Sequence, residues 1–178
     1  MKSLYKTHFL FLFLLLVIGC SNSDNGNNVD IDTNAKGTIL LSGEDTSEVG
    51  TTLIVGDIVE GRVDLTGIED SIIIVEEGAT ISDDPAPFPP GDPRNVAVFN
   101  RSDPNNGFVI VVKDGAISMS IVVESLPYTH ACDSEFNIFT NCGSLDLILN
   151  ENKVIFTDTT VENTDTGAIL TLNGTITW

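Results

Sequence analysis

The chain has 178 residues, with 26 Asp and Glu, eight Lys and Arg, and a net charge of −18. This length accommodates one domain, and the hydrophobic content of 42% is enough for a packed core, which excludes wholesale disorder. Because so acidic a surface repels phosphate backbones and anionic lipid headgroups, the composition excludes nucleic-acid binding and electrostatic docking on a membrane.

The N-terminal segment predicts export. Lys2 and Lys6 supply positive charge ahead of an apolar run at residues 9–18, which is too short to span a bilayer as a helix. The run ends in Val-Ile-Gly-Cys at residues 17–20. An ordinary secretory signal that happens to end in a Cys is one interpretation.

The order of these parts in residues 1–20 resembles the lipobox signal of bacterial lipoproteins. This resemblance implies removal of residues 1–19 and acylation of Cys20, for example by palmitate. It also implies an exported protein that is anchored by lipid to the bacterial cell envelope, at the outer membrane, on its periplasmic or surface face.

The segment after this signal predicts a flexible tether at residues 20–36, because it is rich in Asn, Asp, Ser and Gly. A flexible chain of this length reaches about 20–24 Å. The sequence therefore predicts a domain at residues 37–178 that is held just above a membrane.

From residue 37 onward, apolar and polar residues alternate with a period of two, which is typical of strands with one buried face. Asp114-Gly115 between two apolar runs predicts a tight hairpin, because both turn positions favour a positive φ. The predicted strands are 38–42, 51–55, 58–65, 71–76, 95–100, 108–113, 116–124, 145–149, 154–158 and 170–178.

Nine or ten short strands separated by turn residues predict an all-β, antiparallel domain. Because residues 72–75 and 109–112 are apolar on both faces, the sequence favours a β-sandwich. A lipocalin-like β-barrel is the alternative. Lipocalins normally show a cleaner alternation and open on a Gly-x-Trp motif, whereas the single Trp of this chain is its last residue, Trp178.

Two segments interrupt the strand pattern and predict long loops. Residues 82–94 hold five of the seven prolines, and residues 126–144 hold Cys132 and Cys142. Two cysteines in an exported domain predict one structural disulfide. Because loops on a rigid β-scaffold often carry binding sites, the ring-bearing residues of these loops are candidate contact residues. They are Phe88, Tyr128, His130, Phe136 and Phe139.

The sequence contains no recognisable catalytic motif. Gly-x-Ser-x-Gly and His-Glu-x-x-His are both absent, and His130 is the single histidine after residue 20. A pair of carboxylates could still hydrolyse glycans. However, 26 acids place many pairs close together by chance, so we assign no catalytic residue.

Clustered acids in two loops are candidate calcium ligands, because Ca²⁺ prefers carboxylate and carbonyl oxygens. The candidates are Asp83, Asp84, Asp92 and Asp103. The alternative is that acidity serves solubility alone.

Taken together, the sequence favours a lipid-anchored module of the cell envelope with a non-catalytic binding or structural role. Its partner, a protein or a glycan, stays open, and a carboxylate-based glycan hydrolase is the alternative function. No cofactor is predicted apart from the candidate calcium.

Overall fold

A computed structural model describes residues 36–133 and 140–178. The signal segment, Cys20 and most of the tether lie outside the described residues, as do Phe136 and Phe139. The described residues hold two clusters of buried apolar side chains.

The described elements are mostly short antiparallel strands. The strands are β1 (Gly37–Gly43), β2 (Thr52–Glu60), β3 (Ser71–Glu76), β4 (Thr80–Ile81), β5 (Phe99–Asn100), β6 (Gly107–Lys113), β7 (Ala116–Val123), β8 (Leu126–Cys132), β9 (Ser144–Ile148), β10 (Lys153–Asn163) and β11 (Ile169–Thr177). The helices are α1 (Thr46–Val49), α2 (Val63–Thr66), η1 (Pro93–Val98) and η2 (Leu149–Glu151). Among the residues that the structure describes, no helix has both the length and the apolar character needed to cross a membrane.

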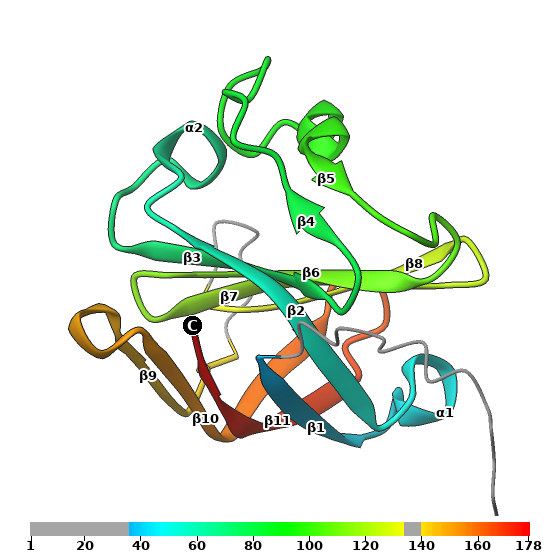
Figure 1. Cartoon of the computed structure of the whole chain (residues 1–178). Coiled ribbons are helices and arrows are strands. Elements are labelled where there is room, and N and C mark those ends of the chain that lie inside the picture. The colour runs from blue at the N-terminus through cyan, green and yellow to red at the C-terminus, as the bar shows by residue number, and fades with distance from the viewer. Residues whose placement is uncertain (1–35, 134–139) are drawn as a thin grey trace, which may run out of the picture. The chain divides into compact units, whose positions relative to one another are not determined.

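Eight of the strands form a closed barrel (Figure 1). The sheet runs in the order β11-β1-β2-β3-β6-β7-β8-β10, and β10 pairs back with β11. The predicted all-β, antiparallel class is thus confirmed. The β-sandwich is wrong, and the β-barrel given as the alternative fits the strand order.

The sandwich prediction failed because β3 is buried on both faces, and β6 is partly covered on its outer face, for a different reason. On β3, Ile72 and Ile74 point into the barrel, while Ile73 and Val75 point outward and are also buried. Residues 77–106, which connect β3 to β6 and which we call the insert, cover this outer side with β4 and β5 (Figure 1). The outer apolar face therefore packs against the small β4–β5 sheet of an insertion and not against a second full sheet.

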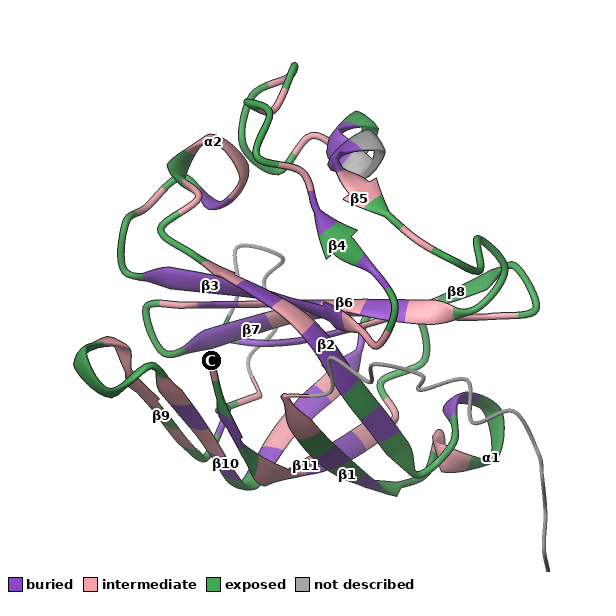
Figure 2. Cartoon of the chain, in the orientation of Figure 1, coloured by how far each residue is buried: buried purple, intermediate pink, exposed green. Residues whose placement is uncertain are grey.

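Large apolar side chains fill the barrel interior. Most barrel strands alternate buried and exposed residues, as Figure 2 shows along β1 and β2. Phe156, Met119 and Ile110 are among the largest side chains that are completely buried, and they belong to one continuous inner cluster. This alternation is what the period-two pattern predicted.

One predicted turn lies inside a strand. The sequence predicted a turn at Gly56-Asp57, but β2 continues through it with a shift of register between Val55 and Ile58. A Cβ atom at residue 56 would lie 2.3 Å from the backbone oxygen of Glu76 on β3, so only glycine permits this approach. The bulge therefore lets one strand curve where two strands were expected.

Residues 126–144 are not one long loop. Their first part is β8, which pairs with β7 along its whole length, and Pro127 is tolerated near the start of the strand. The predicted disulfide is confirmed: Cys132 ends β8, Cys142 precedes β9, and their Cα atoms are 5.1 Å apart. Both cysteines lie in the inner cluster, so the disulfide joins the barrel to the β9–β10 hairpin.

Burial of β3 on both faces predicts a large cost for an outward-facing substitution. Ile73→Ala should lower the free energy of unfolding by about 2–5 kcal/mol, because it opens a cavity under the insert. Ile54→Ala is the matched control, since Ile54 also points outward but is 45% exposed, and it should cost less than about 1 kcal/mol. Urea unfolding measures both values. Equal costs would contradict the packing of the insert on β3.

Removal of the disulfide gives a second test of the fold. The double substitution Cys132→Ala and Cys142→Ala should lower the free energy of unfolding by about 2–3 kcal/mol, because the unfolded chain regains the freedom of the closed loop. Chemical reduction of the unsubstituted domain should produce a similar loss in the same urea titration, whereas a reduced protein of unchanged stability would show that the bond is not formed.

Candidate binding groove

A groove runs along the outer face of β6 and β7, beside the insert. It consists of two hollows of about 370 and 500 Å³, which share Gly91 and Val111. Volumes of this size are typical of sites for small molecules. The groove combines an apolar floor with polar groups at its rim.

Strand alternation produces the apolar floor. On β6, Ile110 and Val112 point into the barrel, so Val109 and Val111 point outward. Across the pairing with β7, Val109 faces Ser120, and Val111 faces Ser118. Both valines are only partly buried, because the insert covers β3 more completely than β6 and β7. The floor thus offers apolar surface together with two hydroxyl groups.

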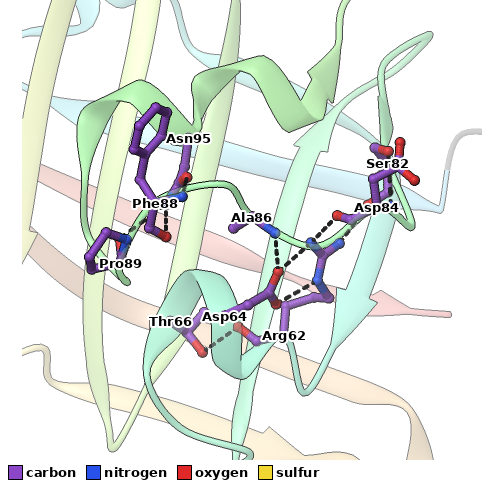
Figure 3. A network of polar contacts seen from close by, with 9 residues as sticks. All are labelled: Arg62, Asp64, Thr66, Ser82, Asp84, Ala86, Phe88, Pro89 and Asn95. Carbon is purple, nitrogen blue, oxygen red and sulfur yellow. Dashed lines mark hydrogen bonds and ion pairs between the residues drawn. The ribbon is translucent and has the colours of Figure 1, made fainter.

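An ion-pair network holds the wall of the groove in place (Figure 3). The Arg62 guanidinium donates two hydrogen bonds of 2.8 Å to the Asp64 carboxylate, and it also donates to the backbone oxygens of Ser82 and Asp84. The Asp64 carboxylate in turn accepts a hydrogen bond from the backbone N–H of Ala86. The Arg62 hydrogen bonds, helped by that of Ala86, hold the pKa of Asp64 well below its usual range. The network therefore ties α2 to the first half of the proline-rich loop.

A second set of contacts fixes the other half of that loop (Figure 3). The Asn95 side chain accepts a hydrogen bond from the backbone N–H of Phe88 and donates to the backbone oxygens of Phe88 and Pro89. Arg94 lies over the Phe88 ring, 3.8 Å from its centroid, and forms an ion pair with Asp92. The ring of Phe88 thus already contacts Arg94, a residue of the same loop.

One arginine joins the insert to the barrel at the end of the groove. The Arg101 Nε atom donates to the Glu76 carboxylate at 2.7 Å, and both side chains are largely buried. Among the described residues, no hydrogen-bond partner is found for the buried Nη2 atom of Arg101. A Cβ atom at residue 107, where φ is 143°, would lie 2.3 Å from that nitrogen, so Gly107 makes room for the guanidinium.

The structure separates the predicted contact residues. Phe88 lies on the insert, whereas Tyr128 packs against the inner cluster of the barrel. His130 is 0% exposed and hydrogen-bonds through Nε2 to Asp45, which also accepts from Asn163. A partner cannot reach His130 in this structure, and the predicted residues Phe136 and Phe139 lie outside the described residues.

The candidate calcium ligands do not form a cluster. Within residues 36–133 and 140–178, no group of three or more His, Cys, Asp or Glu side chains could hold a metal ion. Asp92 is engaged by Arg94, Asp103 accepts hydrogen bonds from Asn105 and Asn106, and Asp83 and Asp84 are exposed. The adjacent pair Asp83 and Asp84 is therefore separate from Asp92 and from Asp103, and the two engaged carboxylates each have a protein donor.

Three described carboxyl groups, those of Asp64, Asp92 and Asp103, are unsuited to acid catalysis. Glycan hydrolysis requires a carboxyl group with a raised pKa as the general acid. The carboxyl pKa values that the structure shifts, those of Asp64, Asp92 and Asp103, are all lowered, because arginine or amide groups donate hydrogen bonds to them. These groups stay ionised at neutral pH and cannot deliver a proton to a leaving group.

Comparison with known proteins gives no relative from which a function could be transferred: no protein-family model, no curated protein and no solved structure matches the chain.

Sequence reasoning missed the residues that build this groove. Its floor residues were interpreted as one side of a strand covered on both faces, and the sequence gives no sign that the cover stops short of Val109 and Val111. One available signal was the pair Arg62 and Asp64. These opposite charges lie two residues apart and precede the proline-rich loop, to which both bind in the structure. The sequence did correctly single out that loop as irregular structure.

The Arg62–Asp64 pair predicts a pH-dependent contribution to stability. The folded-state pKa of Asp64 is lowered, so its contribution is complete above pH 4 or so, the pKa of an unfolded Asp, and is lost as pH falls further. Asp64→Asn should therefore be less stable than the unsubstituted domain at pH 7, and the difference should shrink between pH 4 and pH 2. Urea unfolding at several pH values measures it.

Asp84→Asn is the matched control for this prediction. Asp84 is exposed and contributes its backbone oxygen to the same network, so the substitution leaves that hydrogen bond in place. It should have little effect at any pH. A difference for Asp64→Asn that stays constant down to pH 2 would show that the carboxylate charge is not what stabilises the wall.

Proposed function

We propose that this protein is a lipid-anchored, non-catalytic binding module of the bacterial cell envelope. In this proposal, acylated Cys20 and the tether hold the barrel domain at the outer membrane, and a ligand binds in the groove between the insert and β6–β7. The lipobox-like sequence at residues 17–20 supports the anchor. The half-exposed valine floor of the groove is the observation that carries the binding function.

The charges around the groove restrict the ligand. Asp92, Asp114 and Asp133 line its hollows together with Lys113 and Arg101, and residues 21–178 carry six basic against 26 acidic residues, a net charge of −20. An anion would be repelled from this surface. The ligand that fits is a small amphipathic molecule without negative charge, whose apolar part covers Val109 and Val111 and whose polar part meets the serine hydroxyls.

A lipocalin-like role is a finer version of this proposal. Eight-stranded barrels such as lipocalins can hold one small ligand inside. Here Phe156, Met119 and neighbouring side chains fill the interior, and a shallow hollow of about 330 Å³ at the α1 end is flanked by Glu76 and Glu77. We therefore place the ligand outside the barrel. No observation favours the glycan hydrolase that the sequence left open.

A fluorescent probe tests the groove. N-phenyl-1-naphthylamine is uncharged and fluoresces in apolar surroundings, and it should bind the domain (residues 21–178) with a saturable signal. Val111→Trp fills the space shared by the two hollows and should weaken binding at least tenfold. The anionic dye 1-anilinonaphthalene-8-sulfonate should bind more weakly than the neutral one, because of the surrounding acids.

Leu126→Trp is the matched control, since Leu126 is 60% exposed and lies outside both hollows. Its affinity for the neutral dye should equal that of the unsubstituted domain, and both variants should keep its melting temperature within a few degrees. Equal binding by the Val111→Trp variant would refute the groove as the binding site.

A further inference from the structure

One face of the barrel carries no acidic or basic side chain. It is built from outward-pointing residues of β11, β1 and the first half of β2, and we call it the uncharged face. Its members are Thr38, Leu40, Ser42, Thr52, Ile54, Thr171, Asn173 and Thr175. The pairing places Leu40 between Asn173 on β11 and Thr52 on β2, so the members form one continuous patch.

This absence of charge is unusual for so acidic a protein. No charged residue occurs anywhere in β1 or β11, although residues 21–178 carry a net charge of −20. Charges resume at the margins of the patch, with Glu44 after β1, Glu77 beside Ile54, Asp158 on β10, and the pair of Lys36 and Asp57 next to the start of β1. The Asp158 carboxylate accepts a hydrogen bond from the Asn173 side chain. The uncharged face is thus a surface region without charged side chains on a strongly acidic protein.

The same face exposes apolar side chains among hydroxyl groups. Leu40 is 56% exposed and Ile54 is 45% exposed, and they are two of the four large apolar side chains that are exposed in the described residues. They lie diagonally across the β1–β2 pairing, because Leu40 faces Thr52 and Ile54 faces Thr38. Two neighbouring apolar groups ringed by hydrogen-bonding side chains suit the boundary between lipid headgroups and acyl chains.

The start of the domain lies at this face. Lys36 directly precedes β1, the middle strand of the uncharged face, and its backbone N–H donates to the oxygen of Val55 on β2. The chain that leads back to Cys20 therefore leaves the domain here. A lipid on Cys20 would hold this side of the barrel within the reach of a short tether from the membrane.

We propose that the uncharged face rests on the lipid headgroups of the membrane that holds Cys20. The proposal depends on the lipid anchor of the proposed function. The net charge of the domain repels anionic headgroups, and this face approaches them at a lower cost because its own members carry no acid. The sequence predicted a domain held above the membrane, and the structure supplies a surface with which it touches the membrane.

This orientation also places the binding groove. In Figure 1, β1 and β11 lie at the bottom, while α2, β4 and β5 lie at the top, with β3, β6 and β7 between them. The insert and its groove are therefore on the far side of the barrel from the uncharged face. A domain that rests on this face presents its groove to the surrounding solvent.

Site-specific labels test the orientation in the full chain, produced in bacteria with its own signal. Thr38→Cys and Thr175→Cys each introduce one thiol on the uncharged face, and Val63→Cys introduces a control thiol on α2. The new thiol is the one available for labelling, because Cys132 and Cys142 form a disulfide and Cys20 is acylated in the proposal. Each variant carries a nitrobenzoxadiazole fluorophore in vesicles of phosphatidylcholine and phosphatidylglycerol.

A headgroup-nitroxide phosphatidylcholine in the vesicles should quench the labels at residues 38 and 175 at least twofold and leave the label at residue 63 unchanged. The double substitution Leu40→Asp and Ile54→Asp, made in the Thr175→Cys variant, should abolish this quenching while the protein still floats with the vesicles. Cys20→Ala should abolish flotation.

The outcomes separate the two proposals. Flotation with unquenched face labels, or with equal quenching of all three labels, overturns the orientation and leaves the anchor standing. A blue shift of the face labels that the nitroxide does not affect shows contact between two copies of the chain, and it also overturns the orientation. Failure of the unsubstituted chain to float overturns the anchor and the orientation together.

Discussion

Burial of β3 on both faces is the constraint on which the rest of the structure depends. Ile72 and Ile74 fill the barrel, and Ile73 and Val75 hold the insert against its outer side. Alternating side chains of one strand thereby serve two cores at once. Because the outer core is small, it covers β3 fully and the neighbouring β6 only in part. The groove is the surface that this second core leaves uncovered, so its position follows from the same six-residue strand.

The few basic residues reinforce this arrangement. Three of the six that follow residue 20 are Arg62, Arg94 and Arg101, and each forms an ion pair within or beside the insert. The contacts of Arg62 and Arg101 matter most, since both guanidinium groups are largely buried and a lone buried charge is costly. An irregular, proline-rich segment has no sheet of its own to satisfy its backbone groups. Side chains such as those of Arg62 and Asn95 supply those hydrogen bonds instead.

The sequence predicted the elements better than their assembly. The period-two pattern located β3, β6, β7 and β11 almost to the residue, because these strands obey simple alternation and end at turn residues. It missed β8, where Pro127 and a run of polar residues hide the strand, and it divided β2 at Gly56, where a bulge resembles a turn. Closure of the barrel depends on the pairing of β10 with both β11 and β8, which joins strands that no local pattern brings together. The groove and the buried contact between His130 and Asp45 depend on similarly distant residues.

The strand β9 carries an unpaired edge beside the closed barrel. In the described part of the chain, the other strands of the main sheet have a neighbour on both sides, whereas β9 pairs with β10 alone. An unpaired strand edge is a template on which identical molecules can add to one another. The exposed carboxylate of Asp146 lies at the centre of β9 and would face its own copy in an antiparallel pairing centred on this residue. Crowded copies would thus meet local charge repulsion at this edge, in addition to that of their high net charge, and neutralisation of Asp146 would weaken it.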